Sequence, residues 1–185
     1  MWPLSPPGGN TMLIEQAGEP VGEVLSQNDA KAHCRASDFD DDDTLIDGYI
    51  LAAVEYVQDV CQTILLRTPF KATGPRFDLS FTGFPKPEIS SVSYVDDLGA
   101  TITVDPSQYE ICEGRLVVHG VTSLASATAE FTAGIGAGNV PAKLVQAARM
   151  MVAHWYANRE AAGEGLAPVP LGVRDMVALH RSFAF

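Results

Sequence analysis

The chain has 185 residues, 46% hydrophobic and 19% charged, which is enough for one compact domain with a buried core. Its 23 acidic and 12 basic residues give a formal net charge of -11, which repels phosphates and argues against a protein that reads DNA or RNA sequence. The three cysteines, Cys34, Cys61 and Cys112, have no zinc-site or disulfide-framework spacing, so a reducing cytoplasm is expected. A signal peptide and a bilayer-spanning apolar run are both missing, so we expect no membrane association.

The N-terminal part of the chain is rich in proline and glycine. Residues 1–20 show no hydrophobic period, so we expect a flexible arm ahead of a single domain over residues 21–185. Ser26 is of a type that caps helices, and it predicts a short helix over residues 26–35.

The strongest helical pattern follows an acidic run. Apolar residues recur every three to four positions over residues 42–66 and predict a helix about 30 Å long. Carboxylates at a helix start interact favourably with the helix dipole and cap free amides, so we interpret the acidic run as a helix start. A calcium site is the alternative, although the glycine and glutamate of an EF-hand loop do not fall in register. The run comprises Asp38, Asp40, Asp41, Asp42 and Asp43.

A β-rich segment follows over residues 76–133. Apolar and polar residues alternate there with period two, as in the run Phe77, Leu79 and Phe81. Turn formers such as the pair Glu113 and Gly114 separate the runs. Closely spaced turns predict hairpins, and therefore an antiparallel sheet of about five or six short strands.

A glycine-rich turn from Gly134 to Gly138 joins the last strand to a helix that Pro141 opens and that we expect over residues 141–161. The turn lacks the lysine and hydroxyl residue of a P-loop and the strand–helix–strand context of a dinucleotide site. We therefore interpret it as a flexible connection between sheet and helix, and we predict no cofactor.

The end of the chain combines a short expected helix over residues 173–181 with two aromatic residues, Phe183 and Phe185. Exposed aromatic rings at a terminus are costly in water unless something covers them. Either the chain's own core or a neighbouring molecule provides that cover.

Catalytic patterns are missing from the sequence. The four histidines are scattered, and none lies in a nucleophile elbow or an H-E-x-x-H site. We therefore predict no catalytic residues, no metal ligands and no enzymatic activity.

Several short motifs resemble, in their order, those of the head-to-tail connector (adaptor) proteins of tailed phages, which also occur in prophages and gene transfer agents. The resemblance covers residues 20–185 approximately. Its motifs in the first half are Lys31, Ala32, His33 and Arg35, then Asp43, Leu45 and Ile46, then Ala52 and Ala53, then Val92, Ser93, Tyr94, Val95, Asp96 and Gly99, then Tyr109. Those in the second half are Ala133, Gly134, Ile135, Gly136, Val140 and Pro141, then His154, Trp155, Tyr156, Asn158, Arg159 and Glu160, then Pro170, Leu171, Gly172, Val173 and Arg181.

The resemblance implies an α+β fold: a small helical bundle of two long helices plus short terminal helices, with an inserted antiparallel β-sheet. It also implies a homo-oligomeric ring, usually a dodecamer, in the neck of a virion or virus-like particle. Such a ring docks under the portal protein, completes the head after DNA packaging and meets the stopper or tail proteins. Genome DNA passes through it without sequence-specific binding, along a wall whose acidity prevents adhesion.

The same resemblance assigns portal binding to the C-terminal segment, with Phe183 and Phe185 as apolar anchors. The portal-binding candidates are Pro170, Leu171, Val173, Arg181, Phe183 and Phe185, and the motif helix carries Trp155, Tyr156, Arg159 and Glu160. A stopper or tail-completion protein is the nearest alternative, and it would be richer in strands without two long helices. A small cytoplasmic enzyme or regulator is the other alternative, and it would show a deep polar pocket.

Overall fold

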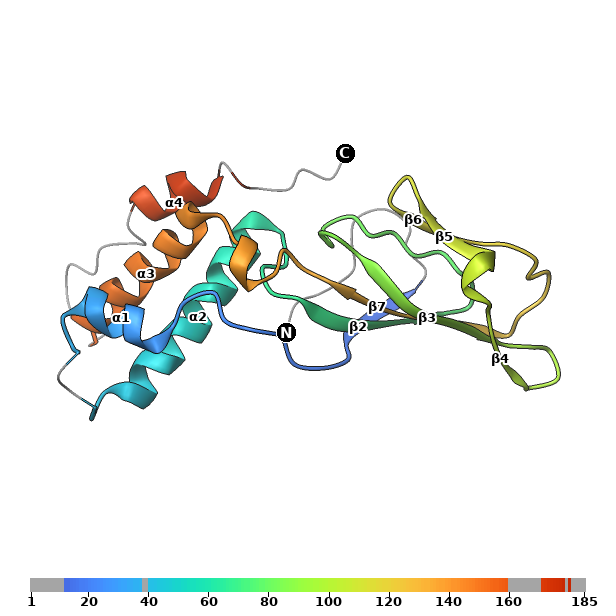
Figure 1. Ribbon diagram of the computed structural model, residues 1–185, viewed down its shortest axis with the longest axis horizontal. Helices are drawn as coiled ribbons and strands as arrows, with labels where there is room; N and C mark the ends of the chain where they lie inside the picture. Colours follow the sequence, from blue (N-terminus) through green and yellow to red (C-terminus); the bar gives the residue numbers. More distant parts are fainter. Residues whose placement is uncertain (1–11, 38–39, 160–170, 179, 181–185) are drawn as a thin grey trace. The chain divides into compact units, whose positions relative to one another are not determined.

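The computed structural model describes residues 12–37, 40–159, 171–178 and 180 (Figure 1). The chain divides into two compact units. Of the described residues, the β unit contains 12–21 and 66–135, and the helical unit contains 22–37, 40–65, 136–159, 171–178 and 180.

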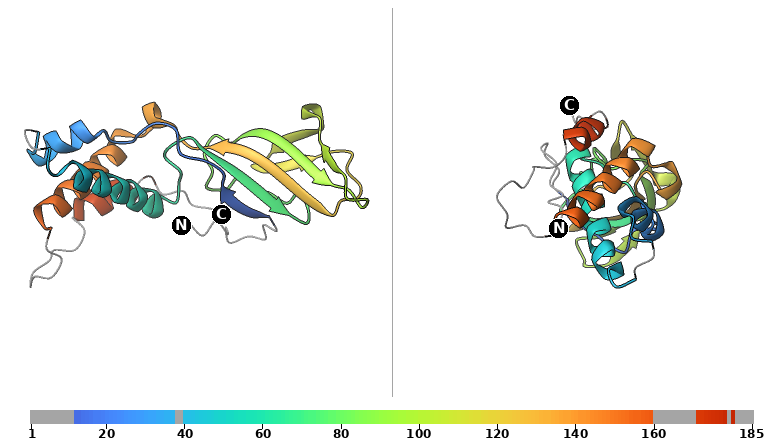
Figure 2. Two further views of the ribbon diagram at one scale, coloured as in Figure 1. Left: turned by 90° about the horizontal axis from the view of Figure 1, so that it is seen from below. Right: turned by 90° about the vertical axis from the view of Figure 1, so that its left-hand side faces the viewer.

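The β unit is built on a five-stranded antiparallel sheet with the order β1-β2-β7-β3-β4, accompanied by a two-stranded sheet of β5 and β6. Figure 2 shows β2, β7 and β3 side by side with the twist usual for such a sheet. The strands are β1 Leu13–Gln16, β2 Thr68–Gly74, β3 Glu88–Val95, β4 Thr101–Thr103, β5 Tyr109–Cys112, β6 Arg115–Val118 and β7 Ser126–Ala133, with a 3-10 turn, η1, at Pro106–Gln108.

One face of the five-stranded sheet forms the core of the β unit. Period-two alternation places apolar side chains on this face, and Phe131 on β7 is its largest fully buried side chain. Three further rings surround Phe131 with centroid distances of 5.0 to 5.5 Å, from Phe70, Phe81 and Phe84. This aromatic cluster gives the β unit a hydrophobic core of its own.

The helical unit consists of α1 Gln27–Cys34, α2 Asp43–Cys61, α3 Ala142–Ala157 and α4 Leu171–Ala178, with a 3-10 turn, η2, at Ala137–Asn139. Helix α3 contacts each of the other three helices, and Figure 2 shows them around it. The apolar stripes of α2, α3 and α4 form the core, in which these side chains are fully buried: Ile46, Val57, Cys61, Leu144, Met151, Val152, Val173 and Val177.

The expected fold class, a small helical bundle of two long helices and short terminal helices with an inserted antiparallel sheet, is wrong. The chain has four helices and two antiparallel sheets within its described residues, and the sheets belong to a compact unit of their own. Two physical reasons account for the difference. Strand β1 precedes the described helices and pairs with β2, so the sheet is not a simple insertion, and the cluster around Phe131 gives the β unit a core of its own.

Strand β2, Thr68–Gly74, precedes the β-rich segment expected over residues 76–133, because Pro69 does not fit a strand pattern. Proline cannot donate to a ladder. Here Pro69 lies beyond the end of β1 and uses only its carbonyl, which accepts a hydrogen bond from Ala17 at 2.9 Å. Its strand partner β1 lies within residues 1–20, where we expected an arm, and the long helix expected over 42–66 ends at Cys61.

The glycine-rich turn has a steric role at Gly134. This residue has φ +135°, and a Cβ placed on it would lie 2.0 Å from the Leu66 carbonyl oxygen. Only glycine permits that approach between the end of β7 and the chain that leads into β2. The interpretation of this turn as a backbone connection therefore has a steric basis.

Across the described part of the chain, no helix combines the length and the apolar character that crossing a bilayer requires.

Candidate functional site

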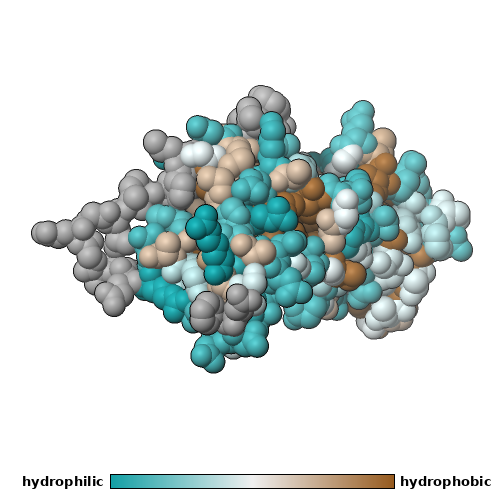
Figure 3. Space-filling view, turned by 60° about the vertical axis from the view of Figure 1, so that its left-hand side comes forward, coloured by the Kyte–Doolittle hydropathy of each residue, from teal (hydrophilic) through white to brown (hydrophobic). Residues whose placement is uncertain are grey.

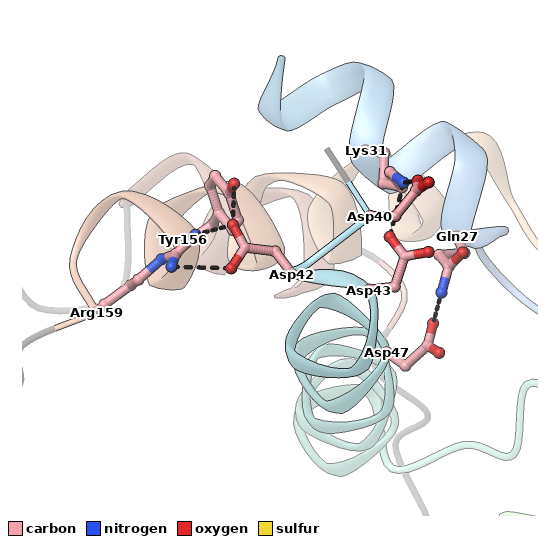
Figure 4. A network of polar contacts seen from close by, with 8 residues as sticks. All are labelled: Gln27, Lys31, Asp40, Asp42, Asp43, Asp47, Tyr156 and Arg159. Atoms are coloured by element: carbon pink, nitrogen blue, oxygen red, sulfur yellow. Dashed lines mark hydrogen bonds and ion pairs between the residues drawn. The ribbon is translucent and has the colours of Figure 1, made fainter. Parts of the chain in front are cut away.

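The acidic run between α1 and α2 is the centre of a polar network in the helical unit (Figure 4). Its carboxylates face side chains from α1 on one side and from the end of α3 on the other. Gln27 on α1 also donates a hydrogen bond to Asp47 on α2 at 2.8 Å. The network thus links three of the four helices of this unit.

Lys31 on α1 is the cation of the first half of the network. Its side chain is 7% exposed, and its Nζ lies 2.9 Å from Asp40 Oδ1 and 2.7 Å from Asp43 Oδ1. The interactions with Asp43 and then with Asp40 raise the pKa of Lys31, because both carboxylates favour the charged ammonium. Asp43 Oδ1 is itself buried and accepts no hydrogen bond from the described residues. Its partner among them is the Lys31 ammonium, with which it forms an ion pair.

Asp42 is the anion of the second half. Tyr156 Oη donates to Asp42 Oδ2 at 2.7 Å, and Arg159 donates to Oδ1 at 3.1 Å and also to Oδ2. The Arg159 and then the Tyr156 hydrogen bonds lower the pKa of Asp42. The Arg159 guanidinium also lies over the Tyr156 ring, 4.4 Å from its centroid. Tyr156 in the last turn of α3 and Arg159 just beyond it thus connect the end of this helix to the start of α2.

The acidic run lies at the start of α2, as the helix-start interpretation expects, but the expected capping hydrogen bond from an aspartate side chain is not made by Asp42. Asp43 lies in the first turn of α2, where a carboxylate complements the dipole. Asp42 occupies the N-cap position, but its side chain makes no capping hydrogen bond because α3 engages it instead. Among the residues that the structure describes, no group of three or more His, Cys, Asp or Glu side chains could hold a metal ion.

The motif helix α3 presents its residues to different partners. Trp155 is half-buried and lies against Tyr49 of α2, with ring centroids 6.1 Å apart. Tyr156 and Arg159 meet on Asp42, and Glu160 lies outside the described residues. The Asp42–Arg159 pair spans 117 positions, so no spacing rule in the sequence could have revealed it.

The portal-binding candidates fall largely outside the described residues. This holds for Pro170, Arg181, Phe183, Phe185 and the side chain of Leu171. Val173 is fully buried, so it belongs to the core of the helical unit and has no surface for a partner. Its neighbour one turn on, Val177, accepts a hydrogen bond from Cys61 Sγ at 3.7 Å, and burial raises the pKa of that thiol to about 11. Helix α4 is thus anchored to α2.

Large apolar side chains are exposed on both units. Figure 3 shows apolar atoms (brown) at the surface between polar ones (teal). Leu98 is the most exposed of them, at 93%, and Leu51 on α2 is 69% exposed. The others are Leu13, Val21, Leu45, Ile102 and Ile111. An isolated subunit leaves all of these in water.

No protein-family model matches the sequence, and no curated protein does either. Solved structures do match the fold. A chain from the virion of a native gene transfer agent particle is 20% identical, with a TM-score of 0.71, over 94% of this chain and 97% of that one. A chain from the neck of an empty gene transfer agent particle, computed with C6 symmetry, is 19% identical with a TM-score of 0.70 over the same shares.

A chain from the neck of a native gene transfer agent particle, computed with C12 symmetry, is also 19% identical, with a TM-score of 0.66 over the same shares. Over nearly its whole length the protein therefore has the fold of chains found in gene transfer agent particles. The resemblance seen in the sequence points to the same class of particle.

Proposed function

We propose that the protein is a structural component of the neck of a tailed phage or gene transfer agent. It acts there as the adaptor between the portal and the stopper or tail. The observation that carries this proposal is the likeness to the gene transfer agent virion chain, which spans 94% of one chain and 97% of the other.

The proposed assembly is a homo-oligomeric ring, with twelve copies as the expected number. Two of the similar chains come from necks computed with C6 and C12 symmetry. The outer face of α2 supports a ring, because Leu45 and Leu51 are exposed there, with Gly48 and Ala52 also exposed between or beside them. Such an apolar stripe is costly in a monomer and is covered when a neighbouring copy packs on it.

The acidic composition fits a channel through which DNA moves. A formal net charge of -11 per subunit, repeated around a ring, gives a field that on balance repels phosphates. Purified rings should therefore not retain duplex DNA at low salt. Retention that weakens as salt rises would contradict this part of the proposal.

The proposed portal contact is the C-terminal segment that begins at Pro170. Helix α4 supports this assignment because its buried Val173 and Val177 fix the start of the segment to the helical unit. The proposed apolar anchors are Phe183 and Phe185.

The test combines a gene deletion with a paired variant in a producing strain. Deletion should yield DNA-filled heads without tails. Phe183→Ser with Phe185→Ser should reproduce that phenotype while the protein stays folded, and Leu98→Ser, at a solvent-exposed site in the β unit, is the matched control for loss of an exposed apolar side chain. Tailed particles in normal numbers after deletion would refute the neck assignment, and tailed particles with the paired variant alone would refute the anchors.

A further inference from the structure

Within the described residues, the five-stranded sheet ends at β1 on one side and at β4 on the other, and no further strand pairs with either edge. The pairs β1/β2, β2/β7, β7/β3 and β3/β4 are all antiparallel. Four reversals restore the original direction, so β1 and β4 run the same way. A copy rotated about an axis along the strands would therefore bring its β1 beside β4 of its neighbour in parallel orientation.

The outer side of β4 carries unpaired backbone groups. Ala100 accepts a backbone hydrogen bond at 2.9 Å from the turn after β3, and Val104 donates one at 2.8 Å to β3. Because bonded and non-bonded pairs alternate in an antiparallel ladder, the amides and carbonyls of Thr101 and Thr103 point away from β3. Within the described residues, these outward groups have no hydrogen-bond partner.

Strand β4 also lacks several of the devices that usually protect a sheet edge. Its three residues, Thr-Ile-Thr, are exposed and carry neither charge nor proline. β-Branched residues favour strand pairing, so this edge accepts another strand readily. Its short length limits each contact to a few hydrogen bonds, which suits an interface repeated around a closed ring.

The same alternation shows which backbone groups of β1 point away from β2. Ala17 donates a backbone hydrogen bond to Pro69 at 2.9 Å, which places the backbone groups of Ile14 and Gln16 on the outer side of β1. Leu13, at the start of this strand, is 59% exposed. Glu15 is the one charged residue on β1, so a contact with the uncharged β4 brings no like charges together.

We propose that β4 of one copy pairs in parallel with β1 of the next copy, so that the sheets of neighbouring subunits join edge to edge. This inference rests on the proposed ring, because a contact between two different edges is heterologous and closes only through repeated copies. Pairing of two β1 strands would instead bring Glu15 near its own counterpart, which is unfavourable.

Disulfide trapping between the two edges tests the pairing. Leu13 and Thr103 lie on the same face of the sheet, because successive cross-strand partners connect them through Thr73, Thr128 and Ser93. Glu15 lies on this face as well, because it is two positions after Leu13 in the strand. Within one copy the two edges are four strand spacings apart, about 19 Å, whereas a disulfide needs Cα atoms within about 7 Å. A disulfide between the edges therefore forms only between copies.

The variants are Leu13→Cys with Thr103→Cys and Glu15→Cys with Thr103→Cys, in a background of Cys34→Ser and Cys112→Ser. The buried Cys61 is retained. After mild oxidation, at least one pair should give a ladder of covalent oligomers on a non-reducing gel.

The matched control is Lys71→Cys with Thr103→Cys. Lys71 pairs with Glu15 and is an exposed residue on the same face, but it lies one strand inside the edge. This control should give no ladder. Native mass spectrometry of the background protein, alone and with portal, establishes separately whether the ring forms.

A ring without a ladder from either pair would overturn the edge pairing and leave the ring intact. Dimers from Thr103→Cys alone would also overturn it, because they would show that β4 pairs with itself. No ring in the background protein under either condition would refute the proposed ring and the pairing with it.

A second comparison removes only the outward amide hydrogen. Proline is tolerated at an edge where the N–H faces outward, so Thr103→Pro should leave the β unit folded. Thr103→Val keeps the amide. If the pairing is right, Thr103→Pro weakens each contact about tenfold relative to Thr103→Val, measured as the concentration at which rings form. Equal assembly of the two variants, with equal melting temperatures, would overturn the pairing.

Discussion

Phe131→Ala is the sharpest test of the core that makes the β unit independent. Phe131 is 1% exposed and packs against Phe81 at 5.0 Å, Phe84 at 5.3 Å and Phe70 at 5.5 Å between centroids. Truncation of a buried phenylalanine costs about 3–5 kcal/mol. The three ring pairs, at about 0.5–1.5 kcal/mol each, place this site in the upper part of that range.

The matched control is Phe77→Ala. Phe77 is half-buried and has one ring partner, Tyr94, with centroids 6.4 Å apart. Its truncation should cost about 1–2 kcal/mol, the usual size for a partly exposed apolar site.

Equilibrium urea unfolding measures the two free energies of unfolding. Hydrogen exchange of the β3 and β7 amides should also accelerate much more in Phe131→Ala than in Phe77→Ala. If the two variants lost equal stability, the aromatic cluster would not be the core of the β unit.

Three further predictions concern single sites. Folding lowers the pKa of Asp42, so the ionised carboxylate stabilises the fold above the unfolded pKa of about 3.9, and this stabilisation is lost as pH falls through the folded pKa. In urea unfolding between pH 2 and 6, Asp42→Asn should therefore reduce the loss of stability at acid pH. An unchanged acid dependence would contradict this. Lys31→Met should lower the melting temperature, because the buried Oδ1 of the half-buried Asp43 carboxylate loses its partner. Lys31→Met with Asp43→Asn should recover part of that loss, and no recovery would show the pair to be uncoupled. Gly134→Ala should give little soluble protein, because the new Cβ would lie 2.0 Å from a carbonyl oxygen. Gly138→Ala is the control, because a Cβ there meets nothing within 4 Å, and its yield should be normal. Equal yields of the two variants would argue against the close approach.

The sequence predicts local structure well wherever one period dominates. The alternation through Tyr109 and Leu116 corresponds to β5 and β6, and the helical spacing after Asp43 corresponds to α2. In these segments the side chains that set the period are also the ones that pack, so local pattern and tertiary structure agree.

Long-range partners decide the features that the sequence could not predict. Proline is rare inside a sheet, yet Pro69 fits near the start of β2 because only its carbonyl is needed there. Asp42 has the residue type and position of a helix cap, yet Tyr156 at the end of α3 and Arg159 just beyond it bind its side chain from more than a hundred positions away. Such pairings depend on the folded chain and leave no spacing signal.

Imaging the neck of particles purified from producing cells by cryo-electron microscopy is the most direct test of the central claim, that this protein is a repeated structural subunit of the head–tail junction. We predict density for the four helices and the five-stranded sheet of this chain, repeated around the axis between portal and tail, twelve times if the expected copy number holds. A neck that contains no copy of this chain would contradict the account.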